Sequence, residues 1–230
     1  MHPVKSSSAN QASLIKLGFT TGKTILASRI VGHLQSICSA DNKVKVVFFF
    51  FKHAYIAKRT PSALLLSILS QLASQDEVTL DLLYQQLVAL DHQKLKSVSA
   101  LQELASMALA SQPSCYIVVD GLDECVAELS GGPEDSQNDV LQWMETACST
   151  TNNQRLRILI SGQRNGFLDE RLRHHPSIQL EGIDGHTADI KTYAHVRTRD
   201  IQQKFKIQET QRLDIVDRVS SGAKGKYRDV

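Results

Sequence analysis

Short apolar runs alternate along the chain with segments of helical periodicity. The runs at residues 14–17, 44–51, 116–119 and 156–161 are rich in β-branched, aromatic and leucine residues, a composition typical of strands buried on both faces. Between these runs, apolar residues recur every three or four positions, as they do on one face of an amphipathic helix. The alternation indicates βαβ units and predicts a three-layer α/β fold, with a mostly parallel sheet and helices on both faces.

The helical periodicity also gives approximate bounds for the helices. We expect helices at residues 24–38, from Thr60-Pro61 onward, around 83–90, 101–109 and 140–147, and over 187–204 and 213–219. In this interpretation Thr187 caps its helix, and residues 130–135 form a loop. We divide the chain into a Ser-rich, disordered segment at 1–13, an α/β core at 14–185 and a helical extension at 186–230.

Composition narrows the class of protein without indicating an activity. Hydrophobic residues make up 42% of the chain and charged residues 22%, as in a globular protein rather than a disordered one. The net charge of +2 gives no electrostatic reason to expect a nucleic-acid or membrane partner. The longest apolar run, residues 46–51, is too short to span a bilayer, and residues 1–10 lack the apolar run of a signal peptide. We therefore expect a soluble, cytoplasmic protein.

Neither the cysteines nor the histidines suggest a metal site. The four cysteines are widely spaced and form no C-x-x-C pair, so free thiols in a reducing compartment are the simplest interpretation. No carboxylate or cysteine cluster accompanies the histidines on the expected loops, and we place them in solvent. These residues are Cys38, Cys115, Cys125, Cys148, His53, His174 and His175.

The most informative stretch is the acidic end of the third apolar run. The run stops at Asp120-Gly121-Leu122-Asp123-Glu124. A carboxylate at the carboxyl end of a central parallel strand points into the crevice where open α/β sheets bind ligands. Three carboxylates beside an apolar strand are costly unless water, a cation or a phosphate-bound Mg²⁺ offsets them. Taken alone, the stretch is equally compatible with a solvated acidic turn.

A second motif stands where the first expected strand gives way to a helix. It reads Gly22-Lys23-Thr24. Backbone N–H groups at a helix N-terminus bind phosphate, while the lysine reaches the β- and γ-phosphates and the threonine hydroxyl ligates Mg²⁺. The full pattern G-x-x-x-x-G-K-[ST] is incomplete, because Leu17 occupies its first position. Alone, the tripeptide also suits an ordinary helix start with a surface lysine, but together with Asp120 it forms the pairing that a P-loop NTPase requires.

At this point the chain resembles a known family. It is similar to the NACHT-type P-loop NTPases of the signal-transducing (STAND) class, in the nephrocystin-like form abundant in fungi, over about residues 20–223. The stretches that carry the resemblance are GKTILASRIVGHL, VVFFFFKHAYIAKRT, CYIVVDGLDEC, LRILISGQR and PSIQLEGIDGHTADIKTYAHVR. The most specific is DGLDE, because in that family a small residue follows the Mg²⁺-binding aspartate and another acid lies three positions on.

The resemblance implies binding of ATP or GTP with Mg²⁺, coupled to self-association, and effector and repeat domains elsewhere in the full-length protein. It places Mg²⁺ on Thr24 and Asp120, and makes Asp123 the general base with Glu124 as second candidate. It also makes Arg164 a sensor of the γ-phosphate, although this arginine equally suits a surface turn. The phosphate-binding residues that it implies are Thr20, Thr21, Gly22, Lys23, Thr24 and Ile25.

Two stretches depart from the family pattern. Where the family has a Gly-rich turn, this chain has Leu17-Gly-Phe-Thr-Thr21, and bulky or β-branched residues there resist the backbone conformations that cradle phosphate. After residues 221–225 the family continues with an apolar helix and a helical lid or winged-helix region, whereas this sequence stops at Val230. We therefore expect a fragment or an imperfect gene model.

Two functions of different classes follow. The first is a nucleotide-dependent switch in which slow, Mg²⁺-dependent hydrolysis resets conformation and assembly, and the intact Lys23, Thr24, Asp120 and Asp123 favour it. The second is a catalytically inactive scaffold that acts through protein contacts, which the altered loop favours. A small-molecule kinase is a third and weaker option, because the sequence offers no acceptor site.

Overall fold

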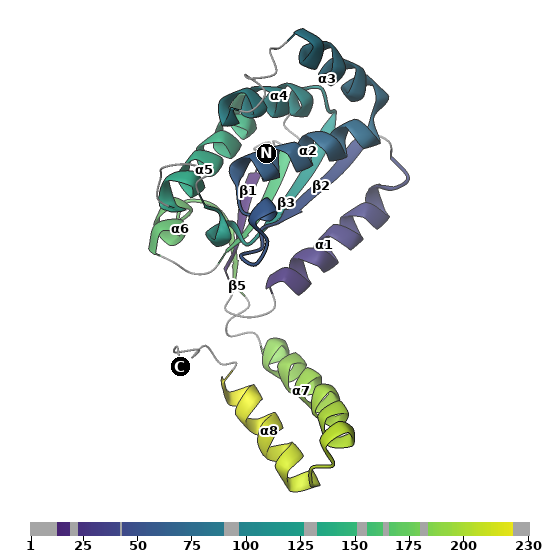
Figure 1. The fold of residues 1–230 in the computed structure, drawn as a ribbon, viewed down its shortest axis with the longest axis vertical. Coiled ribbons are helices and arrows are strands. Elements are labelled where there is room, and N and C mark those ends of the chain that lie inside the picture. The colour runs from purple at the N-terminus through teal and green to yellow at the C-terminus, as the bar shows by residue number, and fades with distance from the viewer. Residues whose placement is uncertain are drawn as a thin grey trace, which may run out of the picture. The chain divides into compact units, whose positions relative to one another are not determined.

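A parallel β-sheet forms the centre of the α/β unit. The computed structural model describes residues 13–18, 23–41, 43–89, 97–126, 133–150, 156–162, 166–179 and 184–222. The strands are β1 (Ser13–Gly18), β2 (Val44–Phe50), β3 (Ser114–Asp120), β4 (Leu156–Gly162) and β5 (Ser177–Gln179), in the spatial order β2-β3-β4-β1-β5 (Figure 1). The pairs β2–β3, β3–β4 and β4–β1 are parallel. The predicted α/β class with a mostly parallel sheet is therefore confirmed.

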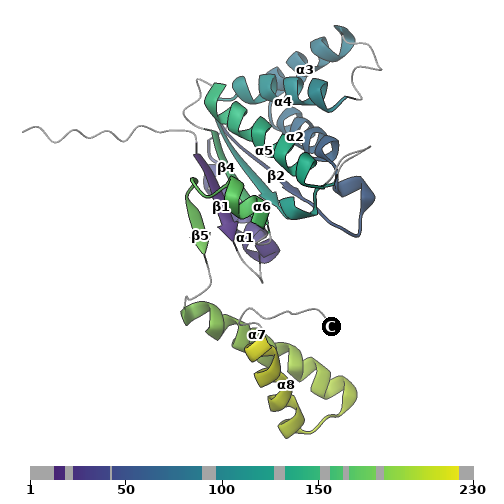
Figure 2. The same ribbon diagram turned by 90° about the vertical axis from the view of Figure 1, so that its left-hand side faces the viewer.

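Helices cover both faces of this sheet. Successive side chains of a strand point to opposite faces, and apolar side chains on both faces are buried under helices. On one face, α1 (Lys23–Cys38) packs Ala27 and Val31 against Val118 of β3. On the other face, α2 (Pro61–Gln75), α4 (Val98–Ala110) and α5 (Pro133–Thr150) share one large core with the alternate strand residues, among them Ile117 and Val119 (Figures 1 and 2). The remaining helices of this unit are α3 (Glu77–Ala89) and the short α6 (Gly166–Arg171).

Most of the expected helices are present, and local chemistry explains several of their ends. The Thr60 side chain accepts a hydrogen bond from the Ala63 N–H at 3.2 Å and so caps α2, with Pro61 at the first helical position. The expectation of a loop over residues 130–135 was wrong at its end, because α5 begins at Pro133, where proline loses no helical hydrogen bond. Thr187 is not a cap, since its helix begins at Asp184.

The free edge of the sheet is closed by two glutamines of α2. Strand β2 lies at this edge. Gln71 binds both backbone groups of Phe48: its Oε1 accepts from the Phe48 N–H at 3.1 Å, and its Nε2 donates to the Phe48 carbonyl at 2.7 Å. Gln75 binds Val46 in the same way, at 3.4 and 3.1 Å. Two glutamines one helical turn apart on α2 thus bind two residues of β2 that are two positions apart. Their side-chain amides take up backbone N–H and C=O groups of β2 that an exposed edge strand otherwise offers to other chains.

Two helices near the C-terminal end form a separate compact unit, the α7–α8 hairpin. They are α7 (Asp184–Phe205) and α8 (Glu209–Gly222). Arg212 is only 6% exposed, and it donates to both carboxylate oxygens of Glu209, at 2.5 and 2.9 Å. Gln202 of α7 donates to the same carboxylate at 3.0 Å. The hydrogen bond from Arg212 is the largest cause that lowers the pKa of Glu209 to about 2, so this carboxylate stays ionised at neutral pH.

We expect Gln71→Ala to lower the free energy of unfolding by about 1–2 kcal/mol, because it removes both side-chain hydrogen bonds to the Phe48 backbone, along with those to Ser67. The matched control is Gln85→Ala on α3, whose side chain is exposed and whose loss changes stability by about 0.5 kcal/mol or less. Urea unfolding of both variants measures the difference. Equal effects from the two substitutions would contradict a role for Gln71 at the sheet edge.

Candidate functional site

The two sequence motifs meet at the carboxyl edge of the sheet. Asp120 is the last residue of β3, and its side chain points to the face that α1 covers, as does that of Val118 two residues earlier. Thr24 stands in the first turn of α1, and its hydroxyl donates to Oδ2 of Asp120 at 2.6 Å. One hydrogen bond therefore joins two residues that are 96 positions apart in the sequence, one from each of the two motifs.

A serine that the motifs did not indicate binds the other oxygen of Asp120. Ser161 lies near the end of β4, and the register of β3 with β4, which pairs Val119 with Ile160, places it beside Asp120. The Ser161 hydroxyl donates to Oδ1 of Asp120. Both groups are buried, Asp120 at 3% and Ser161 at 1% exposure. A buried carboxylate is tolerated when hydrogen bonds replace its hydration, and here each oxygen accepts one from a hydroxyl.

Gly121 has a conformation that explains the small residue after the aspartate. Its φ is +74°, and a Cβ built on it would lie 3.3 Å from the backbone oxygen of Phe51. Its N–H donates to the Ser161 carbonyl at 3.0 Å. The chain thus turns sharply after Asp120 while it stays bound to β4, and only glycine adopts this left-handed conformation at low cost.

The next two acids diverge within a short 3₁₀ turn, Leu122–Glu124. Glu124 faces the loop after β2, where its Oε2 accepts from the His53 N–H at 2.5 Å. Asp123 lies beside the end of β4, since its Oδ1 is 3.2 Å from the place that a Cβ on Gly162 would occupy. In the sheet β4 is the neighbour of β1, so Asp123 lies toward the strand that precedes the Gly22-Lys23-Thr24 motif and Glu124 lies away from it.

A buried glutamine of α5 holds this turn through hydrogen bonds to its backbone. Gln137 is 2% exposed, and its Nε2 donates to the carbonyls of Asp123 at 3.1 Å and Cys125 at 3.5 Å. Leu122, at the start of the turn, is fully buried in the core. Burial of Leu122 and the two hydrogen bonds from Gln137 therefore hold the backbone that carries the acids. Sequence analysis missed Gln137, since a single glutamine in a helix carries no recognisable signal.

The remaining predicted site residues divide into two groups. Lys23 and Ile25 join Thr24 in the first turn of α1, and the Ile25 side chain is 66% exposed, so any phosphate contact of this residue uses its backbone N–H. The other predicted residues, Thr20, Thr21, Gly22 and Arg164, lie outside the described residues. The structure therefore brings together the lysine, the threonine and the acids, and the assignment of their roles remains a prediction.

The oxygen atoms at this edge fit Mg²⁺. This ion takes oxygen ligands and is usually held by one or two protein groups, with water and substrate phosphates completing the shell. Because Thr24 gives its proton to Asp120, its oxygen lone pairs are available to a cation, and the carboxylate keeps unused lone pairs. In the described part of the chain, no three His, Cys, Asp or Glu side chains gather at one place.

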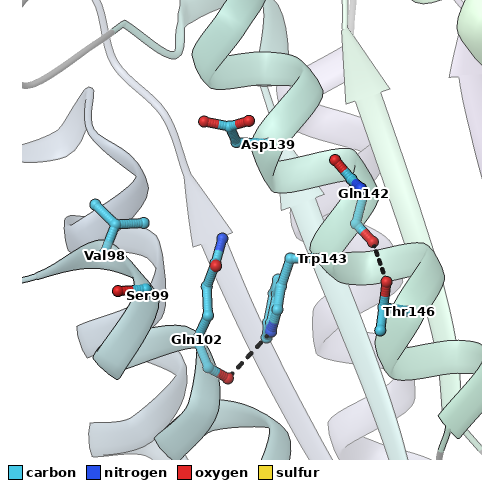
Figure 3. A pocket seen from close by; sticks show the side chains of 7 residues that line it. All are labelled: Val98, Ser99, Gln102, Asp139, Gln142, Trp143 and Thr146. Atoms are coloured by element: carbon cyan, nitrogen blue, oxygen red, sulfur yellow. Dashed lines mark hydrogen bonds between the residues drawn. The ribbon is translucent and has the colours of Figure 1, made fainter.

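A separate groove lies between α4 and α5. It has a volume of about 550 Å³, and Trp143 is one of its lining residues. The Nε1 of Trp143 donates to the Gln102 carbonyl at 3.2 Å (Figure 3). The same N–H also donates to Ser106 at 3.0 Å. None of the seven lining residues in Figure 3 is basic, and one of them is Asp139. This groove therefore lacks the positive groups that bind phosphate, unlike the edge that carries Lys23.

All four cysteines lie in the described part of the chain, and none of them forms a disulfide there. Cys115 is deeply buried, and desolvation raises the pKa of its thiol to about 12, so it is not a reactive nucleophile.

Within the described residues, no helix combines the length and the apolar character needed to cross a membrane.

Comparison with known proteins connects this geometry to a family. The sequence model of the family described as "Nephrocystin 3, N-terminal" matches residues 4–163. The chain belongs to this family. The match ends just after β4, so the nephrocystin-type region includes Thr24, Asp120 and Ser161. Together with the α/β fold, this match supports a relationship to P-loop NTPases, which the sequence analysis predicted.

The solved structures that are similar to the chain include the Walker-type ATPase PABY2304 of Pyrococcus abyssi. The two share 11% sequence identity and align with a TM-score of 0.41, over 95% of this chain and 64% of that one. The chain thus spans about two thirds of that protein's length. A comparison with curated proteins found no match.

We expect Gly121→Ala to lower the free energy of unfolding of this nephrocystin-type domain by about 1–2 kcal/mol, because alanine strains the left-handed backbone at this position. Gly32→Ala is the matched control. Gly32 lies inside α1, where an added Cβ meets no atom within 4 Å, and alanine there raises stability by about 0.5–1 kcal/mol. Urea unfolding compares the two, and a change of the same sign in both would contradict the turn geometry.

Proposed function

We propose that this domain is a nucleotide-binding switch of NACHT type. It binds ATP or GTP together with Mg²⁺, hydrolyses the nucleotide slowly, and changes its conformation and self-association as the nucleotide changes. The observation that carries the proposal is the 2.6 Å hydrogen bond between Thr24 and Asp120, because it joins the two motifs that a P-loop NTPase uses to hold phosphate and Mg²⁺.

Each predicted residue has a part in this proposal. The N–H groups at residues 20–25 and the Lys23 ammonium bind the phosphates, as positive groups at a helix N-terminus do. Thr24 and Asp120 hold the Mg²⁺, which when bound neutralises phosphate charge. Arg164 senses the γ-phosphate. The α/β core at 14–185 binds the nucleotide, and the helical extension from residue 186 responds to it.

The positions of the two acids favour Asp123 as the general base. Asp123 lies on the β4 side of the turn, toward the strand that leads into the phosphate loop. Glu124 lies on the opposite side and binds the backbone of His53. A general base must come within hydrogen-bond reach of the proton that it takes, and the geometry supports this for Asp123 over Glu124.

A second candidate function is a catalytically inactive scaffold, and one observation favours it. Strand β1 stays paired with β4 through Gly18, which lies opposite Gly162, and α1 begins at Lys23. Counted from Gly18, the connection therefore reads G-x-x-x-G-K, one residue shorter than the phosphate-loop pattern. A shorter loop with bulky residues offers fewer N–H groups to phosphate.

Nucleotide binding by the full chain distinguishes the two functions. We expect a fluorescent ATP analogue to bind in the presence of Mg²⁺, and Lys23→Ala to weaken binding roughly 10- to 100-fold, because it removes a charge-assisted hydrogen bond to phosphate. The control is Lys43→Ala, an exposed lysine just before the start of β2 and so at the other end of the strands, which leaves affinity unchanged. If the unmodified chain does not bind the analogue at millimolar concentration, the proposal of a nucleotide-binding switch is wrong, and the inactive scaffold remains as the candidate function.

A further inference from the structure

Ser161 is not part of the Gly22-Lys23-Thr24 motif or of the acidic stretch after β3, yet it contacts both Asp120 and Gly121. Its hydroxyl donates to Oδ1 of that carboxylate. Its carbonyl accepts the Gly121 N–H at 3.0 Å, and its Oγ lies 3.3 Å from the same N–H. One residue of β4 therefore contacts both the side chain of Asp120 and the peptide that follows it.

We propose that Ser161 is a positioning residue that orients the Asp120 carboxylate for a divalent cation. The proposal rests on the function proposed above, and it adds a residue to the same site. Ser161 acts through Asp120 and not on the nucleotide, since its hydroxyl proton is donated to the carboxylate.

The need for such a residue follows from the mobility of an aspartate side chain. The terminal torsion of aspartate is broad and nearly twofold, so a carboxylate held at one oxygen can rotate about that contact. Thr24 binds Oδ2 and Ser161 binds Oδ1, and they come from different elements, α1 and β4. Two donors on two oxygens define the plane of the carboxylate, and so fix the direction of the lone pairs left for a cation.

The position of Ser161 also makes this orientation insensitive to solvent. Ser161 is 1% exposed and lies in the parallel pairing of β4 with β1, opposite Leu17 and one residue past the last β3–β4 pair, so its backbone is fixed by the sheet. Water cannot easily replace its hydroxyl in such a buried place. Outer-shell partners of this kind orient metal ligands, and their loss typically costs about 10- to 100-fold in metal affinity.

A titration of Mg²⁺ against the nucleotide-bound full chain tests the proposal. The readout is the fluorescence of a bound ATP analogue, measured in EDTA and then at rising Mg²⁺, for the unmodified chain, Ser161→Ala and Ser161→Thr. We expect Ser161→Ala to raise the Mg²⁺ midpoint roughly 10- to 100-fold, with nucleotide affinity in EDTA within about twofold of the unmodified chain. Ser161→Thr keeps the hydroxyl, and it restores most of the midpoint.

The matched control is Ser114→Ala, which removes a buried serine hydroxyl at the other end of β3. It reports the effect of a buried serine-to-alanine change on the sheet alone, and the Mg²⁺ midpoint should not move. Binding of Mn²⁺ to each nucleotide complex, followed by electron paramagnetic resonance, gives the same ranking without relying on fluorescence.

The outcomes separate this inference from the proposed function. If the unmodified chain binds the analogue and Ser161→Ala has the same Mg²⁺ midpoint as Ser114→Ala, the positioning role of Ser161 is overturned while the switch stands. If Ser161→Ala lowers the affinity for the ATP analogue equally in EDTA and in Mg²⁺, Ser161 stabilises the fold and does not orient a metal ligand, and the proposal is overturned. If the unmodified chain binds no nucleotide, the proposed function fails and this inference fails with it.

Discussion

The carboxylate of Asp120 is the constraint on which the site depends. It is buried at the end of a central strand, where an ionised group is tolerated only if donors replace water. The donors are the hydroxyls of Thr24 and Ser161, one from the first turn of α1 and one from the neighbouring strand. Meeting the hydrogen-bonding needs of one side chain thus sets where α1 begins over the sheet and how β3 and β4 align at their ends.

The acids beyond Asp120 are placed by backbone geometry rather than by their own side chains. The left-handed Gly121 turns the chain at once, and Gln137 binds the carbonyl of Asp123 within the following 3₁₀ turn and that of Cys125 just after it. As a result Asp123 and Glu124, adjacent in sequence, lie toward opposite neighbours of β3. The two similar carboxylates therefore have different neighbours: Asp123 lies beside the end of β4, and Glu124 accepts a hydrogen bond from the loop after β2.

The sequence predicted the elements of this site better than their connections. Buried strands were recognisable because continuous apolar runs leave little alternative, and the acidic strand end and the Gly22-Lys23-Thr24 motif were recognisable because their chemistry is specific. The order in which β4 separates β3 from β1 was not readable, since it depends on long-range pairing. Ser161 and Gln137 were missed for the same reason: each matters only through a partner distant in sequence. The start of α5 was misplaced because Gly-Gly-Pro suggests a loop, although proline is also well suited to a first helical turn.

A double-mutant cycle between Thr24 and Asp120 tests the central interaction most directly. The free energy of unfolding is measured for Thr24→Val, Asp120→Ala, the double variant and the unmodified chain. A hydrogen bond to a charged group in a partly buried site predicts a coupling of at least about 1 kcal/mol. Effects that add to within about 0.3–0.5 kcal/mol would show that the two residues do not interact, and would remove the link between α1 and β3 on which the site is built.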